Sequence, residues 1–303
     1  MGGPIIVHSD EYANWIFDDH HPTQGRRFVN GFNAVMMNLH HTDRSTVSPP
    51  RVVIPRMATV SELQRVHTAE YIHQVTVEHT CDEWRGGRPD LAELAQLFVG
   101  GTLTGLEALL EGQTTLAVNL PGAKHHAQVD RSSGFCVFAD FAIAAKIAQE
   151  AGQRVAILDI DAHHGDGTEN LLFDDAGILT FSVHQGGIFP GTGLGDVPER
   201  RVYNQPLRAG DGDGELRQAV ERFLSLCEEF EPTMLFVAAG ADGLANDPLT
   251  GLQYTIGGLA GAVGLVRTRY PNMPILMGGA GGYQPDGGTP LAWGAMAGAL
   301  NAV

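Results

Sequence analysis

The sequence predicts an α/β protein in which one mainly parallel sheet is flanked by helices on both faces. From residue 115 onward, short apolar, β-branched segments alternate with longer segments of helical periodicity. The strand-like segments are apolar at nearly every position, which is typical of strands that are buried on both faces. The sequence contains no repeat, low-complexity tract or linker, so we expect residues 1–303 to form a single domain.

The N-terminal third is the less regular part of the pattern. A first strand is expected at residues 5–8 and a second at 49–55, where flanking prolines indicate a sheet edge. Residues 9–27 are dense in aromatic and acidic side chains and are expected to form a loop that walls a site. Helices are expected at 61–77, with Ser61 as the N-cap, and at 90–113, where leucine and phenylalanine recur on one side.

The remaining elements alternate regularly along the chain. Strands are expected at 115–120, 155–159, 178–183, 234–239 and 274–278. Helices are expected at 138–150, 167–173, 215–230, 256–270 and 291–300. Because such β-α-β units are connected by right-handed crossovers, the strands should lie parallel and the helices should cover both faces of the sheet.

Composition excludes several classes of protein. The net charge of −16 argues against a nucleic-acid partner, which requires a basic surface, and would favour the encounter with a basic polypeptide. Three widely spaced cysteines indicate neither a disulfide framework nor a cysteine-based zinc site. The first residues lack the features of a signal peptide, and no segment has membrane-spanning length. We therefore expect a cytoplasmic protein with no membrane partner.

The stretch RVAILDIDAHHGDGT, residues 154–168, is the centre of the predicted site. Asp159, Asp161 and His163 alternate after a buried strand, so their side chains should lean to one side. This arrangement is typical of half a divalent-metal site that takes further ligands from elsewhere. The alternative is a strand that runs into a helix capped by Asp166, with solvated histidines.

Other strand ends carry polar residues as well, and ligands of parallel sheets bind outside the carboxyl ends of the strands. Asp242 follows the strand at 234–239, His125 and His126 follow the strand at 115–120, and Tyr283 follows the last strand. Asp161, His163 and Asp242 would give a cation two oxygens and one nitrogen and leave a position open for water and substrate. The histidines would act as base and acid, and Tyr283 would donate to an oxyanion, which implies metal-assisted hydrolysis of an amide or ester.

Several segments resemble the zinc-dependent histone deacetylase family, which includes bacterial acetoin-utilisation-type and acetylpolyamine deacetylases. They occur in the order and spacing of that family: PGAKHHAQVDRSSGFCVF, LDIDAHHGDGT, FPGTG, AGADGLANDPL and GGAGGY. HTAEYI at 67–72 and the His21-Pro22 pair resemble its N-terminal part. The similarity spans nearly the whole chain and implies an arginase/deacetylase-like fold.

The resemblance also implies a role for each candidate residue. The implied residues are Asp161, His163 and Asp242 for the metal; His125, His126, Tyr283, Asp159 and Asp166 for catalysis; Phe135, Phe189, Leu249, Gly134 and Gly281 for the substrate; and Asp159, Asp161, His163, Ser182 and Val183 for a structural potassium ion. In this scheme Asp159 supports His125 and Asp166 supports His126, which acts as the base. Phe135 and Phe189 would form a narrow tunnel around an acyl-lysine chain. Zinc is the implied metal, with iron(II) as the alternative.

Three positions depart from the family pattern. Lys124 replaces an apolar or glycine residue before the histidine pair and is expected to place a cation near the rim of the site. Ala139 stands where asparagine is frequent, with no consequence that we can assign. Leu249 replaces the glutamate by which polyamine-selective members recognise an ammonium group, so an electrostatic anchor is absent there.

We therefore predict a zinc-dependent deacetylase that removes an acetyl or related acyl group from a lysine side chain or a small lysine-like amine. One alternative is an acetylpolyamine or secondary-metabolite deacetylase that uses the same site. Another is a non-catalytic protein that binds acylated ligands, and a homo-oligomer is an open alternative to a monomer. An arginase-like two-manganese hydrolase would need carboxylates for a second metal, which the sequence does not supply at suitable positions.

Overall fold

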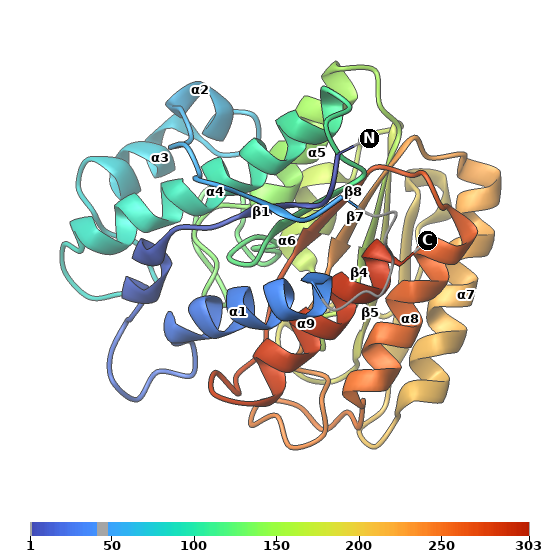
Figure 1. Cartoon of the computed structure of the whole chain (residues 1–303). Helices are drawn as coiled ribbons and strands as arrows, with labels where there is room; N and C mark the ends of the chain where they lie inside the picture. The colour runs from blue at the N-terminus through green and yellow to red at the C-terminus, as the bar shows by residue number, and fades with distance from the viewer. Residues whose placement is uncertain (1, 41–47, 303) are drawn as a thin grey trace.

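A computed structural model describes residues 2–40 and 48–302 of the chain (Figure 1). Within these ranges, eight strands form one sheet in the order β2-β1-β3-β8-β7-β4-β5-β6, and every pairing is parallel. The strands are β1 (Ile5–Val7), β2 (Arg51–Val53), β3 (Leu116–Asn119), β4 (Val155–Asp159), β5 (Ile178–Gln185), β6 (Val202–Leu207), β7 (Met234–Ala238) and β8 (Ile275–Gly278). The predicted parallel sheet is confirmed, and β2 lies at its edge as expected.

Helices cover the sheet in two layers. The helices are α1 (Arg26–His40), α2 (Val60–Leu63), α3 (Ala69–Thr76), α4 (Pro89–Leu110), α5 (Asp140–Glu150), α6 (Asp166–Leu172), α7 (Asp213–Phe230), α8 (Ile256–Arg269) and α9 (Gly288–Asn301), with short 3-10 helices at Asp10–Asn14 and Pro198–Arg200. Helices α1, α9, α8 and α7 pack side by side in that order, and α4, α5 and α6 form the other layer (Figure 1). Among the described residues, no helix is both long and apolar enough to cross a membrane.

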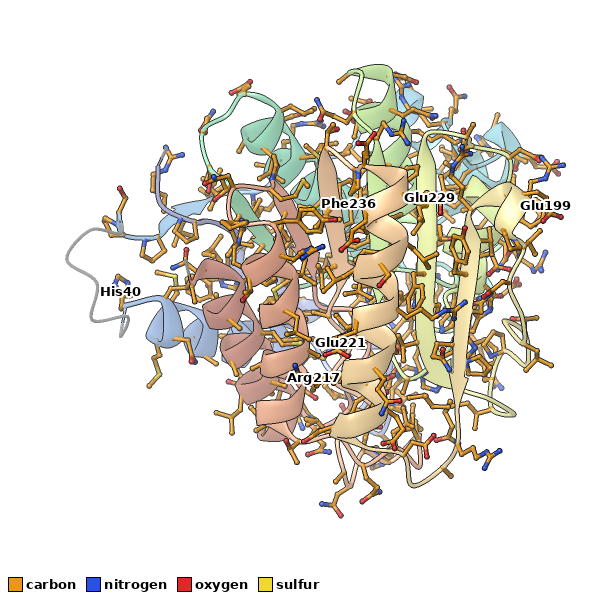
Figure 2. The ribbon with its side chains drawn as sticks, turned by 90° about the vertical axis from the view of Figure 1, so that its right-hand side faces the viewer. His40, Glu199, Arg217, Glu221, Glu229 and Phe236 are labelled. Atoms are coloured by element: carbon orange, nitrogen blue, oxygen red, sulfur yellow. The ribbon has the colours of Figure 1, made fainter. Side chains whose placement is uncertain are left out.

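Figure 2 shows the face of the sheet that α7 covers. Arg217 and Glu221 lie one turn apart on this helix and form an exposed ion pair, with Nε and Oε1 2.9 Å apart. Phe223 of the same helix is buried, and its ring centroid lies 5.7 Å from that of Phe181 in β5. This amphipathic pattern is what the predicted helix-on-sheet packing requires.

Three elements differ from the expectation. Helix α1 occupies the end of the predicted loop and the residues after it, and β6 was not predicted at all. The helix predicted at 61–77 is two helices, which begin after Thr59 and Thr68 rather than after Ser61. Thr59 forms a capping box with Glu62, and the Thr68 hydroxyl accepts the N–H of Tyr71, so each threonine satisfies otherwise unpaired N–H groups.

The order of the strands positions the site. Strand β4 lies between β7 and β5, and Asp159 at its carboxyl end is in register with Ala238 and Ser182. Because all strands run the same way, the loops that follow β3, β4, β5, β7 and β8 gather at one edge of the sheet.

Candidate active site

Two aspartates and one histidine from adjacent strands converge in a buried group. Asp161 and His163 follow β4, and Asp242 follows β7; one ligand atom from each residue lies within 4.8 Å of the others. His163 Nδ1 is 2.9 Å from Asp242 Oδ2 and 3.3 Å from Asp161 Oδ1. The structure therefore brings together the three predicted metal ligands.

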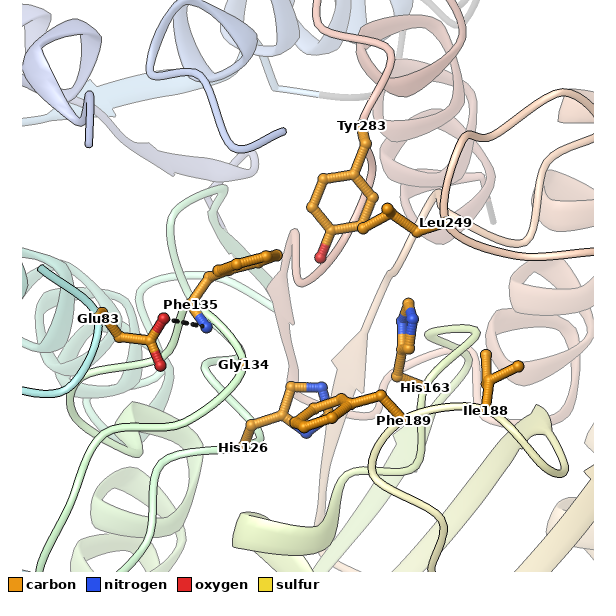
Figure 3. Close-up of a pocket in the computed structure, with 9 residues that line it drawn as sticks. All are labelled: Glu83, His126, Gly134, Phe135, His163, Ile188, Phe189, Leu249 and Tyr283. Atoms are coloured by element: carbon orange, nitrogen blue, oxygen red, sulfur yellow. Dashed lines mark hydrogen bonds between the residues drawn. The ribbon is translucent and has the colours of Figure 1, made fainter. Parts of the chain in front are cut away.

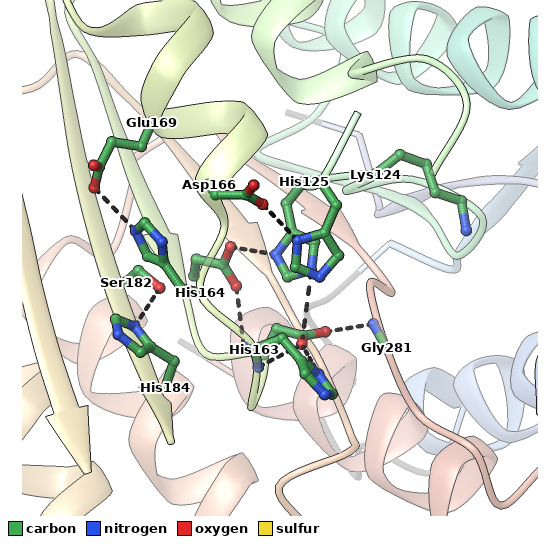
Figure 4. Close-up of polar contacts among 12 residues, drawn as sticks. Lys124, His125, His163, His164, Asp166, Glu169, Ser182, His184 and Gly281 are labelled. Carbon is green, nitrogen blue, oxygen red and sulfur yellow. Dashed lines mark hydrogen bonds and ion pairs between the residues drawn. The ribbon is translucent and has the colours of Figure 1, made fainter. Parts of the chain in front are cut away.

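Backbone N–H groups hold both carboxylates of this group. Ala162 N–H donates to Asp242 Oδ1 at 2.9 Å. Gly281 N–H donates to Asp161 Oδ2 at 2.6 Å (Figure 4). A Cβ atom on Gly281 would lie 2.5 Å from Oδ2 of both aspartates, so only glycine fits there. Burial and the charge of Asp161 raise the pKa of Asp242 to about 7. A fixed, desolvated set of two carboxylates and one imidazole fits a divalent cation, which would relieve this repulsion.

The adjacent histidines each face a carboxylate (Figure 4). His125 Nδ1 lies 2.7 Å from Asp159 Oδ2, and His126 Nδ1 lies 2.7 Å from Asp166 Oδ1. Gln128 Nε2 donates to the other oxygen of Asp166 at 2.9 Å. These contacts fix both rings and place an N–H of each imidazole on Nδ1. Nε2 of His125 lies 3.7 Å from Asp161 Oδ1, beside the metal group.

The two histidines have opposite proton affinities. Burial and the neighbouring charge of His125 lower the pKa of His126 to about 4. For His125, the carboxylates of Asp159 and Asp161 overcome the effect of burial and raise the pKa to about 9. One imidazole is therefore neutral at pH 7 and can accept a proton, whereas the other is charged and can donate one.

A cavity of about 380 Å³ leads to this group from the surface. Figure 3 shows the residues that line it: Glu83, His126, Gly134, Phe135, His163, Ile188, Phe189, Leu249 and Tyr283. The Phe135 and Tyr283 rings meet edge to face with centroids 6.1 Å apart, and Phe189 meets His126 in the same way at 5.0 Å. Gly281 does not line this cavity, although the sequence placed it with the substrate-binding residues.

The cavity walls have specific requirements. Gly134 and Phe135 have φ of 55° and 65°, and a Cβ atom on Gly134 would lie 2.4 Å from the His126 ring. Glu83 Oε2 accepts the N–H of Phe135 at 3.0 Å. The Tyr283 hydroxyl points into the cavity (Figure 3), and burial raises the pKa of this phenol well above its usual value. The phenol therefore stays protonated and can donate a hydrogen bond.

Comparison with known proteins agrees with this geometry. Residues 21–300 match the model of the histone deacetylase domain. The acetoin utilization protein AcuC of Staphylococcus aureus is 31% identical, covering 95% of this chain and 79% of that protein, and AcuC of Bacillus subtilis is 31% identical, covering 97% and 81%. Histone deacetylase 8 of Xenopus laevis is 34% identical, covering 77% of this chain and 78% of that protein.

The chain belongs to the histone deacetylase family. Membership confirms the predicted fold class and the predicted class of enzyme, a deacetylase. It also agrees with a metal-dependent reaction, for which the buried Asp161, His163 and Asp242 could hold the ion.

The residues predicted for potassium share Asp161 and His163 with the metal group, and the other three lie on β4 and β5. Asp159 and Ser182 are paired in register on β4 and β5, and Val183 is the next residue of β5. Ser182 Oγ lies 3.0 Å from His184 Nδ1 (Figure 4). The structure thus brings the predicted residues to adjacent strands, next to the loop that carries Asp161 and His163.

The expectation for Lys124 was wrong. Only 6% of its surface is exposed, and its Nζ lies 5.6–5.9 Å from the ring centroids of Phe98, Phe28 and Trp15. Figure 4 shows the side chain pointing away from the histidines. Burial and the charge of Arg27 lower the pKa of Lys124 to about 8. The side chain of Lys124 is therefore buried in the aromatic core, as an apolar residue would be, and does not lie at the rim of the cavity.

Two further residues beside the site were not predicted. Arg27 of α1 is buried, and its Nη1 donates to the carbonyl of Gly282 at 2.7 Å, next to Tyr283. Asp247 lies in the segment AGADGLANDPL and contacts the backbone of Tyr283. The only sequence signal for Asp247 was the segment itself, whereas Arg27 lay in a region interpreted as loop.

Proposed function

We propose that this protein is a zinc-dependent deacetylase that hydrolyses the acyl amide of an acylated lysine side chain or of a small lysine-like amine. The observation that supports this most strongly is that His163, which groups with Asp161 and Asp242, lines a cavity whose other walls are mainly aromatic and aliphatic, with Glu83 as the one carboxylate in the lining. Such a cavity takes up an extended methylene chain and delivers its terminal amide to the polar group. The proposal treats residues 1–303 as one catalytic domain.

The chain's own residues supply complementary proton chemistry. A divalent cation bound by Asp161, His163 and Asp242 supplies Lewis acidity, which polarises a carbonyl and lowers the pKa of water. Neutral His126 accepts a proton from the attacking water, and its hydrogen bond to Asp166 stabilises the charge that it gains.

Proton donors complete the reaction. Tyr283 donates its hydroxyl hydrogen to the carbonyl oxygen as negative charge develops there. Charged His125, supported by Asp159, gives a proton to the departing amine. The apolar walls at Phe135 and Phe189 exclude bulk water from the acyl-lysine chain and so strengthen these polar interactions.

Two ions belong to the proposal. Zinc suits two carboxylate oxygens and one imidazole nitrogen, and iron(II) is the alternative. A structural potassium ion would bind beside β4 and β5 through Asp159, Asp161, His163, Ser182 and Val183, which is supported by the register pairing of Asp159 with Ser182. The cytoplasmic location, the absence of a nucleic-acid or membrane partner and the oligomeric state stay predictions.

Leu249 distinguishes the main proposal from its closest rival. This residue lines the cavity and is 36% exposed, so the position that could anchor an ammonium group is apolar. We therefore propose acylated lysine-like substrates over acetylated polyamines. Competition of an acetyl-lysine peptide against acetylputrescine and acetylspermine tests this, and a strong preference for the polyamines would reverse the assignment.

The catalytic assignment has a direct test. Tyr283→Phe and Asp161→Ala should each abolish hydrolysis of an acetyl-lysine reporter, while circular dichroism shows a folded protein. Tyr270→Phe, at the end of α8, is the matched control and should retain wild-type turnover. Full activity in the Tyr283 or Asp161 variant would refute the assigned roles. Metal and acyl-ligand binding without turnover in the wild type would support the non-catalytic alternative.

A further inference from the structure

Asp247 connects two residues of the cavity wall. Its side chain is 6% exposed; Oδ2 accepts the N–H of Tyr283 at 3.0 Å, and Oδ1 accepts the N–H of Leu249 at 3.0 Å. Within the described part of the chain, no lysine or arginine forms an ion pair with it. A buried carboxylate is unfavourable unless it is hydrogen-bonded, so these two backbone N–H groups account for its stability at this position.

The loop around Asp247 is tied to the rest of the site. Thr250 Oγ1 donates to the backbone carbonyl of Asp242 at 2.7 Å. Gly251 N–H donates to Oε1 of Gln185, at the end of β5, at 2.7 Å. The position of Leu249 is therefore fixed with respect to a proposed metal ligand on one side and β5 on the other.

Tyr283 lies in a segment whose neighbouring residues are already held, since the N–H of Gly281 donates to Asp161 and the carbonyl of Gly282 accepts from Arg27. It follows Gly282, whose φ of 139° suits glycine, and precedes α9 by several residues. Its hydroxyl makes no hydrogen bond with any residue that the structure describes, as expected for a group that awaits a substrate carbonyl. The N–H bond to Asp247 thus holds the tyrosine backbone in a turn without regular secondary structure.

We propose that Asp247 is a positioning residue that fixes the Tyr283 phenol relative to the Leu249 wall, and so couples carbonyl activation to recognition of the substrate's methylene chain. This inference rests on the proposed deacetylase function. A hydrogen-bond donor accelerates a reaction only when it lies where the oxyanion develops, and a displacement of about 1 Å can lower the rate about 100-fold. Because one carboxylate holds both Tyr283 and Leu249, a substitution of Asp247 should change turnover and substrate selectivity together.

Two substitutions remove these bonds in steps. Asp247→Ala removes both acceptors, whereas Asp247→Asn keeps one, because an amide nitrogen cannot accept from an N–H. We expect kcat on an acetyl-lysine reporter to fall about 10- to 100-fold for alanine and by a smaller factor for asparagine, with KM changed less than about 3-fold. The ratio of kcat/KM for acetyl-lysine to that for acetylputrescine should change in both variants, and it should change more in Asp247→Ala than in Asp247→Asn.

A double-mutant cycle with Tyr283→Phe separates positioning from general damage. If Asp247 acts through the phenol, Asp247→Ala should lower the residual rate of Tyr283→Phe by less than about 3-fold. Equal fractional losses in the two backgrounds would overturn the proposal. If the turnover of Tyr283→Phe is too slow to measure, the test uses Asp247→Asn alone. The proposal is then overturned when this variant has the same kcat and the same substrate selectivity as the wild type.

Controls distinguish the possible failures. Asp211→Ala, which removes a carboxylate that accepts the N–H of Arg208 at 2.8 Å outside the cavity, should keep wild-type kcat. Metal content of each Asp247 variant should match that of the wild type. The thermal midpoint of Asp247→Ala should fall, because two N–H groups lose their acceptor, and Asp247→Asn serves if the alanine variant does not fold. A wild type without turnover of any acylated amine would refute the proposed function, whereas an active wild type with unaffected Asp247 variants would refute the positioning role alone.

Discussion

Lys124 allows a stability prediction whose size follows from its surroundings. The lysine is buried among Trp15, Phe28 and Phe98, and its pKa falls from 10.5 to about 8. This shift corresponds to about 3 kcal/mol, at about 1.4 kcal/mol per pKa unit. Below pH 8 the ammonium is charged in both the folded and the unfolded chain, and folding carries the full penalty. Between pH 8 and 10.5 the unfolded chain binds more protons, so this contribution makes the folded state more stable as the pH rises.

The substitution Lys124→Met removes the charge and keeps an unbranched side chain of similar volume. Contacts of the ammonium with three aromatic rings offset part of the penalty, by about 1 kcal/mol or more, so the gain at pH 7 should be positive but below about 3 kcal/mol. The more decisive quantity is the pH dependence, because the difference between variant and wild type should decrease by this same net penalty, below about 3 kcal/mol, from pH 7 to above pH 10.

Urea unfolding of both proteins at a series of pH values measures this difference, because effects of other groups cancel. Arg65→Met, which removes a partly exposed cation paired with Glu150, is the control and should show no gain at pH 7. A difference between Lys124→Met and wild type that stays constant from pH 7 to 10 would show that the ammonium is solvated and that the burial described here is wrong.

The remaining predictions concern the cavity and the metal group. Gly281→Ala should release the metal and lower activity at least about 100-fold, because its Cβ would lie 2.5 Å from carboxylate oxygens of both Asp161 and Asp242. Metal analysis of the folded variant measures this, and a normal metal content would contradict it. Leu249→Glu should raise the kcat/KM of acetylspermine relative to that of acetyl-lysine about 10-fold, because the new carboxylate attracts the ammonium groups of the polyamine. Steady-state competition measures this ratio, and an unchanged ratio would mean that this position does not contact the amine. Phe189→Ala should raise KM for an acetyl-lysine peptide about 10-fold with little loss of kcat, since the ring is a half-exposed wall, and a loss confined to kcat would place it in the chemistry instead.

The parallel sheet was predictable because the strands after residue 115 are continuous apolar runs. Helix α1 was not, because Gly31 and several asparagines interrupt its pattern. In the structure Gly31 lies against α9 and the residue that follows β3, where a Cβ atom would be 2.5 Å from the Trp293 ring and 2.8 Å from Leu120. A residue that reads locally as a helix breaker is therefore required by packing between helices, which a single sequence does not reveal.

Strand β6 was missed in the sequence for a different reason. It contains Asn204, Gln205 and Pro206, which match a loop better than a strand. It forms one edge of the sheet and, of the strands in the described ranges, pairs with β5 alone, so it tolerates proline and polar residues that an inner strand would not.

The site was more predictable than the fold around it. Topology requires strand ends to meet at one edge, so the convergence of Asp161, His163 and Asp242 follows from the order of elements. The sequence did not predict how deeply each side chain is buried or which residues surround it. Lys124 and His125 are neighbours in the chain, yet one enters an aromatic core and the other faces Asp159.

The most direct test of a single-metal deacetylase is the turnover of acetyl-lysine while the metal is removed by a chelator and then returned as zinc. Activity should disappear with the metal and return in proportion to zinc up to one ion per chain, which the Asp161-His163-Asp242 group can hold. Turnover that persists without metal, or that requires two ions per chain, would contradict the account.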